Sequence, residues 1–305
     1  MHVSAIICTR NRSHQIGNAV RSVLSNTYPD FDLLIVDQST DQRTGEIVQE
    51  LMQDHPNLRY LHTSTPGLSR AYNIGIKETS AELLAFTDDD CVAPADWISN
   101  IVTAFQNDPA AEMLYGQVLE PAELRGHDGI LPQIHIPEPK RYTPREPFHL
   151  FGMGANFAAR RRLLDRIHGF DEILGGGAPL RSSQDFDFQY RAYLAGAVVL
   201  LRPEVKVDHY GLRSREEWPA TNKNYGFGDA SFYVKHVRCG DVRATGMLMA
   251  WLGRFLAREA LSKVGLRRRP TRAEYLWAFW DGMRGSMAFP VDRHRRVYRS
   301  LQQAS

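Results

Sequence analysis

Over residues 3–87, short apolar runs alternate with segments of helical spacing, and this alternation restricts the fold more than any other feature of the chain. The apolar runs cover residues 3–8, 31–36, 58–62 and 83–87, and the helical patterns cover residues 14–24, 45–53 and 68–77. Strands that alternate with helices are typical of a mostly parallel, doubly wound sheet with helices on both faces. We therefore expect an α/β fold.

The chain is long enough to bury a full core. It has 305 residues, of which 43% are hydrophobic and 24% are charged, so a disordered chain is excluded. After Ser214 the pattern changes to long helical segments. We expect residues 1–214 to form the sheet domain and residues 215–305 to form a helical, basic extension. Residues 120–149 lack periodicity and are expected to form a long excursion beside the site.

Polar residues follow the apolar runs. Arg10, Asp37 and Asp88 lie at or just beyond the ends of three of them. In doubly wound sheets, ligands bind outside the carboxyl ends of the strands. We therefore expect these three residues to lie in one functional site.

Three adjacent carboxylates, Asp88, Asp89 and Asp90, follow the fourth apolar run. Their mutual repulsion is unfavourable unless a cation neutralises them. Carboxylate oxygens suit hard cations such as Mg²⁺ or Mn²⁺, which bind one or two carboxylates together with substrate phosphates. The triplet therefore predicts a divalent-cation site, and a solvated acidic turn is the alternative.

Seven segments, in this order, resemble the family 2 glycosyltransferases, which have the GT-A fold. They span most of residues 3–210: VSAIICTRNR (3–12), LLIVDQSTD (33–41), PGLSRAYNIG (66–75), LLAFTDDDC (83–91), GANFAARRRLL (154–164), GFDEILGGG (169–177) and SSQDFDFQYR (182–191). The ordered set is specific, although no single motif is decisive.

The resemblance implies a nucleotide-sugar pocket. Asp37 corresponds to an aspartate that contacts the base or the ribose, and Thr9 and Arg10 would line the same pocket. Arg70 could meet phosphate, and Asn73 could hold the loop around the acidic triplet. Two alternatives remain open, since Asp37 could cap a turn and Arg70 could form a surface ion pair.

The acidic triplet corresponds to the family's DxD motif. By that pattern Asp88 contacts ribose, Asp89 is the variable middle position and Asp90 binds the ion. Many relatives carry a histidine near His209 that reaches the metal or the diphosphate. An ordinary, partly buried histidine is an equally good interpretation of His209.

Asp185 corresponds to the aspartate that serves as general base in inverting members. A carboxylate there can take a proton from an acceptor hydroxyl that attacks the anomeric carbon. Gln184 stands where the family usually has Glu. Asp185 could alternatively cap a helix. Asp187 is expected to face away from it on that helix, and Trp97 is expected in the core rather than under a sugar.

The C-terminal part is basic, with twelve Lys and Arg against four Asp and Glu in residues 251–305. Apolar stripes accompany these arginines within residues 244–261 and 275–283. Such helices can lie on an anionic membrane surface, or they can pack on the sheet domain and leave the arginines solvated. Both interpretations remain open.

Other features limit location and chemistry. The three cysteines, Cys8, Cys91 and Cys239, form no CxxC pair, so a disulfide framework or a zinc site is not indicated. We see no signal peptide and no spanning helix. The expected location is cytoplasmic, with peripheral contact at the inner face of the membrane under the first interpretation of the basic helices.

Together these features predict a metal-dependent, inverting glycosyltransferase that uses Mn²⁺ or Mg²⁺. Its donor would be a nucleotide-diphosphate sugar and its acceptor a hydroxyl of a glycan or lipid-linked molecule, in polysaccharide, glycolipid or cell-envelope glycan synthesis. A net charge of +2 gives no indication of nucleic-acid binding. The alternative is a non-catalytic nucleotide-binding or membrane-tethered scaffold on the same fold.

Overall fold

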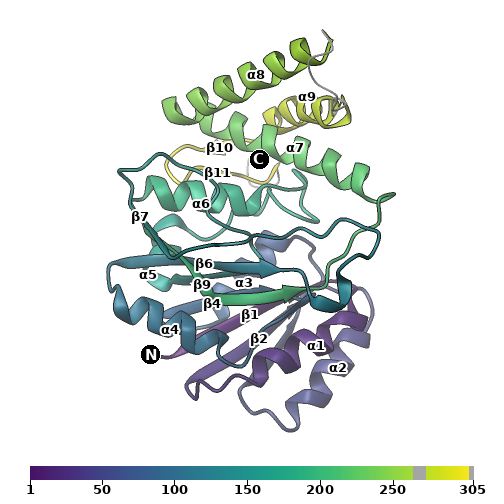
Figure 1. Ribbon diagram of the computed structural model, residues 1–305, viewed down its shortest axis with the longest axis vertical. Coiled ribbons are helices and arrows are strands. Elements are labelled where there is room, and N and C mark those ends of the chain that lie inside the picture. Colours follow the sequence, from purple (N-terminus) through teal and green to yellow (C-terminus); the bar gives the residue numbers. More distant parts are fainter. Residues whose placement is uncertain (264–272, 302–305) are drawn as a thin grey trace. The chain divides into compact units, whose positions relative to one another are not determined.

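The computed structural model describes residues 1–263 and 273–301, and they group into two compact units (Figure 1). The first unit comprises Met1–Phe170 and Asp185–Arg215, and the second comprises Asp171–Gln184 and the chain from Glu216 onward. The sequence pattern places all of residues 1–214 in one domain. In the structure the segment 171–184 belongs to the second unit, because its apolar side chains pack there.

A nine-stranded sheet forms the centre of the first unit. The strands are β1 Val3–Thr9, β2 Phe31–Asp37, β3 Leu58–His62, β4 Leu83–Asp88, β5 Cys91–Val92, β6 Ala111–Leu119, β7 Lys140–Tyr142, β8 Asn156–Arg160 and β9 Val198–His209. Their order is β3-β2-β1-β4-β8-β6-β9-β5, with β7 beside β9. The strands β3, β2, β1 and β4 are parallel, whereas β8 runs antiparallel to both neighbours. The expected mostly parallel sheet is confirmed.

Helices cover both faces of this sheet (Figure 1). They are α1 Ser13–Leu24, α2 Arg43–Met52, α3 Leu68–Glu78, α4 Trp97–Asn107, η1 Ala122–Leu124, α5 Arg161–Ile167 and α6 Gln184–Leu194. Side chains alternate along each strand, so Ile7 packs with α1, α2 and α4, while Ile6 packs with α3, α5 and α6. This burial on both faces explains why the strands are continuous apolar runs.

The strand register fixes where the functional residues lie. Thr9 pairs with Asp37, and Cys8 pairs with Asp88, so three strands end at the same edge of the sheet. His209 ends β9 and pairs with Cys91 of β5, which follows the acidic triplet directly. The carboxyl ends of the strands therefore bring the acidic triplet, Asp37 and His209 to one edge.

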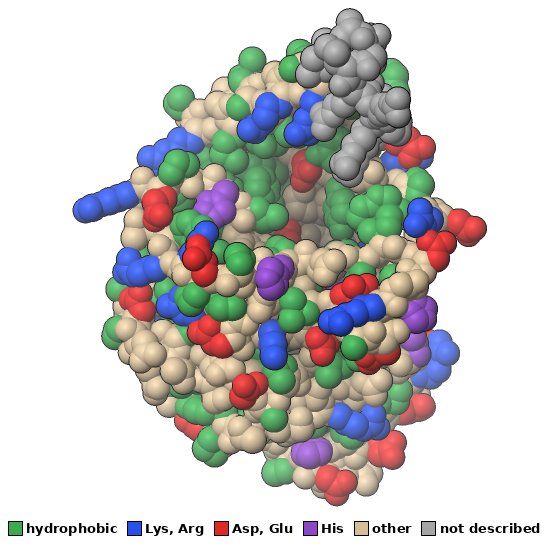
Figure 2. All heavy atoms as spheres, in the orientation of Figure 1, with side chains coloured by type: hydrophobic (Ala, Val, Ile, Leu, Met, Phe, Trp, Pro, Cys, Tyr) green, Lys and Arg blue, Asp and Glu red, His purple; other side chains and the backbone are tan. Residues whose placement is uncertain are grey.

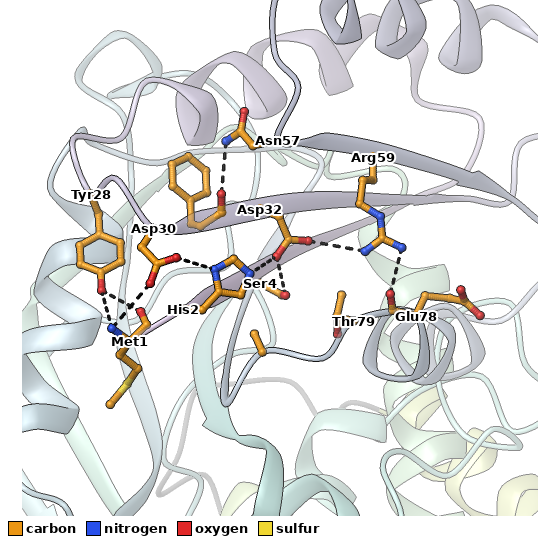
Figure 3. Close-up of polar contacts among 12 residues, drawn as sticks. Met1, His2, Ser4, Tyr28, Asp30, Asp32, Asn57, Arg59, Glu78 and Thr79 are labelled. Atoms are coloured by element: carbon orange, nitrogen blue, oxygen red, sulfur yellow. Dashed lines mark hydrogen bonds and ion pairs between the residues drawn. The ribbon is translucent and has the colours of Figure 1, made fainter.

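The amino ends of the strands carry a separate polar network (Figure 3). The two ring nitrogens of His2 lie 2.9 Å from a carboxylate oxygen of Asp30 and 2.9 Å from one of Asp32. Burial disfavours the charged ring, but the two carboxylates outweigh it and raise the pKa of His2. Arg59 lies 3.7 Å from the other oxygen of Asp32. This network ties the start of β1 to β2 and β3.

Three helices and a short hairpin make up most of the second unit. They are α7 Trp218–Arg238, α8 Val242–Lys263, α9 Ala273–Met287, β10 Val291–Asp292 and β11 Val297–Tyr298. Gly226 and Gly282 allow α7 and α9 to cross closely, since a Cβ at either would lie within 2.4 Å of a backbone oxygen of the other helix. Among the described residues, no helix is long and apolar enough to span a membrane.

A fully buried ion pair lies inside the second unit. The Lys235 ammonium of α7 donates to Asp171 at 2.6 Å, and both side chains have no exposed surface. The backbone N–H of Tyr298 donates to the same carboxylate at 2.9 Å. The pair therefore joins α7, the segment 171–184 and the C-terminal hairpin.

Replacing Lys235 by Met should lower the free energy of unfolding of the second unit by about 3–5 kcal/mol, because Asp171 loses its buried counter-charge. Four of the five tryptophans lie in this unit, so urea denaturation followed by tryptophan fluorescence reports on it. Lys223→Met is the matched control, since Lys223 lies on the same helix but is 52% exposed. The control should change stability by less than about 1 kcal/mol. Equal effects of the two variants would contradict a stabilising role for the buried pair.

Candidate active site

The acidic triplet at the end of β4 is held by side chains from neighbouring elements. The Thr9 hydroxyl donates to Asp89 at 2.6 Å, and the Tyr72 hydroxyl of α3 lies 3.3 Å from Asp88. Asp89 and Asp90 are both buried. The triplet is therefore an ordered part of the sheet edge, which argues against a solvated acidic turn.

Arg12 is the cation of this cluster in the structure. Its Nη1 donates to Asp89 Oδ1 and to Asp90 Oδ2, both at 2.8 Å. Arg12 precedes the first turn of α1. The sequence prediction missed this residue, although the segment Thr9–Arg12 contains two arginines and only Arg10 is predicted to bind. Beyond the end of a strand, the alternation of side chains no longer indicates which of the two arginines points toward the triplet.

The three carboxylates differ in their proton affinity. Burial, together with the charges of Asp90 and Asp89, raises the pKa of Asp88 to about 7. Burial also disfavours ionisation of Asp90, but His209 and Arg12 outweigh it and lower the pKa of Asp90. Asp90 is thus the triplet member whose surroundings favour the anionic form, which a cation ligand requires.

His209 faces Asp90. Its Nε2 lies 3.4 Å from Asp90 Oδ1, and its Nδ1 lies 2.9 Å from the carbonyl oxygen of Pro132. Only a protonated Nδ1 can donate to that carbonyl, which leaves Nε2 of the neutral ring free to act as a ligand. Burial opposes protonation of the ring, but Asp90 outweighs it and raises the pKa of His209. The side chain is buried with a partner for each ring nitrogen, an arrangement that fits both a cation ligand and an ordinary buried histidine.

Potential ligand atoms of Asp90, Cys91 and His209 lie within 4.8 Å of one another. Burial raises the pKa of the Cys91 thiol far above its ordinary value, so Cys91 stays protonated and is a poor ligand. A Cβ at Gly211 would lie 2.5 Å from His209 Nε2 and 2.7 Å from Asp90 Oδ2. The glycine thus keeps the space next to both ligand atoms open. The carboxylate oxygen suits Mn²⁺ or Mg²⁺, with further positions supplied by phosphate and water, and an added imidazole nitrogen suits Mn²⁺ better than Mg²⁺.

Asp37 is fully buried at the end of β2. Its Oδ1 accepts the backbone N–H of Ser39 at 2.8 Å, and its Oδ2 accepts the hydroxyl of Tyr60 at 2.8 Å. The turn-capping role is therefore present in the structure. Each carboxylate oxygen has two lone pairs, so acceptor capacity for a base or ribose remains. Tyr60 is a further residue that the sequence pattern did not indicate.

The remaining predicted nucleotide residues lie at the same edge or on α3. Arg10 is exposed just beyond β1, and Arg70 is half-buried in the first turn of α3. The amide nitrogen of Asn73 donates to the carbonyl of Phe170 at 3.0 Å, and its amide oxygen accepts the N–H of Phe170 at 2.8 Å. Asn73 thus fixes the backbone at Phe170, and its expected role in the loop around the triplet stays a prediction.

The helix α6 begins at Gln184, so Asp185 lies within its first turn and does not occupy the capping position before the helix. Burial raises the pKa of Asp185, and backbone N–H groups, including those of Phe186 and Gly154, oppose the rise. A Cβ at Gly154 would lie 3.8 Å from Asp185 Cβ and 3.8 Å from the hydroxyl oxygen of Tyr72, which contacts Asp88. Asp185 therefore belongs to the same site as the triplet.

Two structural interpretations are confirmed. Asp187 is completely buried and accepts a hydrogen bond from Arg191, one turn later on α6, at 2.8 Å. It stabilises the helix and is directed away from the site. Trp97 has no exposed surface, and its indole N–H donates to Asn156 at 2.9 Å. It is a core residue.

The profile of Glycosyl transferase family 2 matches residues 4–167, which is more than half of the chain. This chain belongs to glycosyl transferase family 2. The match covers the acidic triplet and Asp37, and it ends before Asp185 and His209. The place of Asp185 and His209 in the site therefore rests on the distances and contacts given above.

Individual relatives are distant. An uncharacterized glycosyltransferase of Nostoc sp. is 24% identical over 57% of this chain and 55% of its own length. The glucosyl-dolichyl phosphate glucuronosyltransferase of Haloferax volcanii is 26% identical over 39% of each chain. The chain therefore spans about half or less of the length of these relatives.

Solved structures share the fold. TarS of S. aureus in complex with UDP-GlcNAc has a TM-score of 0.66 at 18% identity and covers 97% of this chain and 84% of its own. The mannosyltransferase PcManGT of Pyrobaculum calidifontis, solved with GDP-Man and Mn²⁺, has a TM-score of 0.59 at 17% identity and covers 94% and 86%. The expected GT-A fold is confirmed.

Gly211→Ala should weaken Mn²⁺ binding by about 10–100-fold, because the added methyl group displaces His209 or Asp90 from its position. The affinity can be measured by isothermal titration calorimetry with UDP or GDP present. Gly176→Ala is the control, since a Cβ there has open space around it and should leave the affinity unchanged. Unaltered Mn²⁺ binding by Gly211→Ala would place the ion elsewhere.

Proposed function

We propose that this protein is a metal-dependent, inverting glycosyltransferase that moves a sugar from a nucleotide-diphosphate sugar to a hydroxyl acceptor. The observation that carries the proposal is the contact series from Asp90 and Asp88 through Tyr72 and Gly154 to Asp185. It supports placing at one edge of the sheet a carboxylate that we assign to a cation and a carboxylate whose pKa is raised. Glycosyl transfer with inversion needs both functions.

The proposed reaction assigns one role to each carboxylate. Asp185 accepts the proton of the acceptor hydroxyl as its oxygen forms a bond to the anomeric carbon. The bond between the anomeric carbon and the diphosphate oxygen breaks, and its electron pair leaves with the nucleoside diphosphate. A divalent ion held by Asp90 and His209 would supply positive charge for that leaving group. The raised pKa of Asp185 makes it a stronger base than an ordinary aspartate.

The nucleotide would occupy the edge beside β1 and β2. Asp37 retains acceptor capacity for a base N–H or a ribose hydroxyl, and Asp88 is the carboxylate that we assign to the ribose. Thr9 and Asp89, which are joined by a hydrogen bond, lie at this edge and would contact the nucleotide. Arg10 and Arg70 are the cations that we assign to the phosphates. Asn73 supports the pocket through its contact with Phe170.

Asp185→Asn should retain donor binding and lose turnover by about 10²–10⁴-fold, because the amide cannot accept the acceptor proton.

Asp90→Ala should instead lose the Mn²⁺-dependent part of donor binding, because the cation loses its carboxylate ligand. A thermal-shift screen of UDP- and GDP-sugars, with and without Mn²⁺, identifies the donor. Calorimetry and release of nucleoside diphosphate then separate binding from turnover in the two variants.

Asp187→Asn serves as the control for carboxylate loss on α6, because Asp187 pairs with Arg191 inside the core. Its residual activity should follow its loss of stability, with no selective effect on turnover. Wild-type turnover in Asp185→Asn would remove Asp185 from the mechanism. Nucleotide binding without any turnover in the wild type, across donors and hydroxyl acceptors, would support the scaffold alternative.

A second proposal concerns the acceptor side. We propose that α8 and α9 contact an anionic membrane surface, where a lipid-linked or glycan acceptor is located. Hydrophobic side chains are exposed on the surface formed by these helices, with basic side chains among them (Figure 2). They include Val242 at 83%, Met249 at 62%, Leu256 at 66%, Trp277 at 72%, Trp280 at 54% and Met287 at 59%.

The spacing and charge of these residues favour a membrane over a second protein surface. Trp277 and Trp280 lie three residues apart, on one face of α9. Arg254, Arg258 and Arg284 are also exposed on α8 and α9. Apolar side chains beside arginines suit the interface of an anionic bilayer.

Trp277→Ser/Trp280→Ser should weaken binding to anionic vesicles by about tenfold or more, because two exposed aromatic side chains that would insert into the bilayer interface are lost. Flotation with phosphatidylcholine vesicles, with and without phosphatidylglycerol, measures this binding. Met52→Ser removes an exposed hydrophobic side chain from α2 and should have no effect. Equal flotation of the wild type and the double variant would contradict the proposal. A wild-type dimer that the double substitution disrupts would also contradict it.

A further inference from the structure

Arg12 occupies the position that a cation would take beside Asp89 and Asp90. A single nitrogen, Nη1, bridges the two carboxylates with two hydrogen bonds of 2.8 Å. His209 faces the other oxygen of Asp90 at 3.4 Å. Asp89 and Asp90 thus have cationic partners supplied by the chain itself.

The backbone beside Arg12 is anchored, while its side chain is accessible. The N–H of Asn11 donates to Ser39 at 2.8 Å, and the amide oxygen of Asn11 accepts the N–H of Thr40 at 2.9 Å. The Arg12 side chain is 41% exposed, compared with 6% for Asp89 and 7% for Asp90. A long side chain on a fixed backbone can turn away from the carboxylates without moving α1.

A divalent ion on Asp90 and the guanidinium of Arg12 cannot share this position without strong repulsion. Both need the same carboxylate, and two cations a few ångströms apart in a buried site repel each other. The ion therefore has to displace Arg12 before it binds. A diphosphate next to the ion would offer the displaced guanidinium new acceptor oxygens, to which arginine binds well.

We propose that Arg12 is an internal counter-cation that holds the ligand-free site closed to metal, leaves Asp90 when the ion binds, and turns to the diphosphate of the donor. The last step rests on the proposed function, and the competition with metal does not. Because the diphosphate removes Arg12 from the carboxylates, donor and ion should bind cooperatively. The ion alone should bind weakly.

Arg12→Gln should bind Mn²⁺ in the absence of nucleotide about 5- to 50-fold more tightly than the wild type, which is the range of typical coupling between sites. Electron paramagnetic resonance of free Mn²⁺ gives the affinity without any activity measurement. Arg12→Lys retains a cation near the carboxylates and should stay close to the wild type. Arg43→Gln has the same change in net charge, but Arg43 pairs with Asp41 outside the cluster and its variant should bind as the wild type does.

Asp90→Ala establishes that the titrated ion is at this site, since it should abolish the binding seen in Arg12→Gln. Mn²⁺ binding in Arg12→Gln that equals or falls below that of the wild type would overturn the proposal, including the case in which neither binds. Weaker binding in the variant would mean that Arg12 orders the carboxylates for the ion. A second titration with UDP and GDP present tests the cooperativity, which should be smaller in Arg12→Gln. Absence of nucleotide binding would contradict the proposed function and leave the result with Mn²⁺ alone intact.

Discussion

The concentration of negative charge at the end of β4 is the constraint on which the rest of the site depends. Asp88, Asp89 and Asp90 lie next to one another and are largely removed from water, so each raises the energy of ionising its neighbours. Thr9 and Arg12 reduce this cost at Asp89, while Arg12 and His209 reduce it at Asp90. Such a cluster is expected where its negative charge contributes to ligand binding. In parallel sheets, ligands bind outside the carboxyl ends of the strands, which is where the cluster lies.

Much of the fold could be predicted from the sequence, because burial on both faces gives the strands continuous apolar runs. The parallel order of β3, β2, β1 and β4 follows from those runs and the helices between them. The grouping of segment 171–184 with the second unit could not be predicted. It depends on contacts such as that of Asp171 with Lys235, which lie far apart in the sequence.

The candidate site also has parts that could be predicted from the sequence and parts that could not. Residues at strand ends, such as Asp37 and the triplet, could be placed because the register of a parallel sheet fixes them. Arg12 and Tyr60 could not, since their roles depend on which way a side chain turns after the chain has folded. The role of Gly211 is also invisible in a single sequence, because it arises from the atoms that a methyl group would meet.

Two aspartates with different environments can divide a reaction between them. Asp90 has a lowered pKa because His209 and Arg12 outweigh its burial, so it remains an anion for a cation to bind. Asp185 has a raised pKa because burial outweighs its backbone donors, so it holds a proton more strongly once it has accepted one. Exchanging these environments would weaken both proposed functions, since a neutral Asp90 would bind no ion and a strongly ionised Asp185 would be a poor base. The surroundings of the two carboxylates, more than their identity as aspartates, therefore suit them to separate roles.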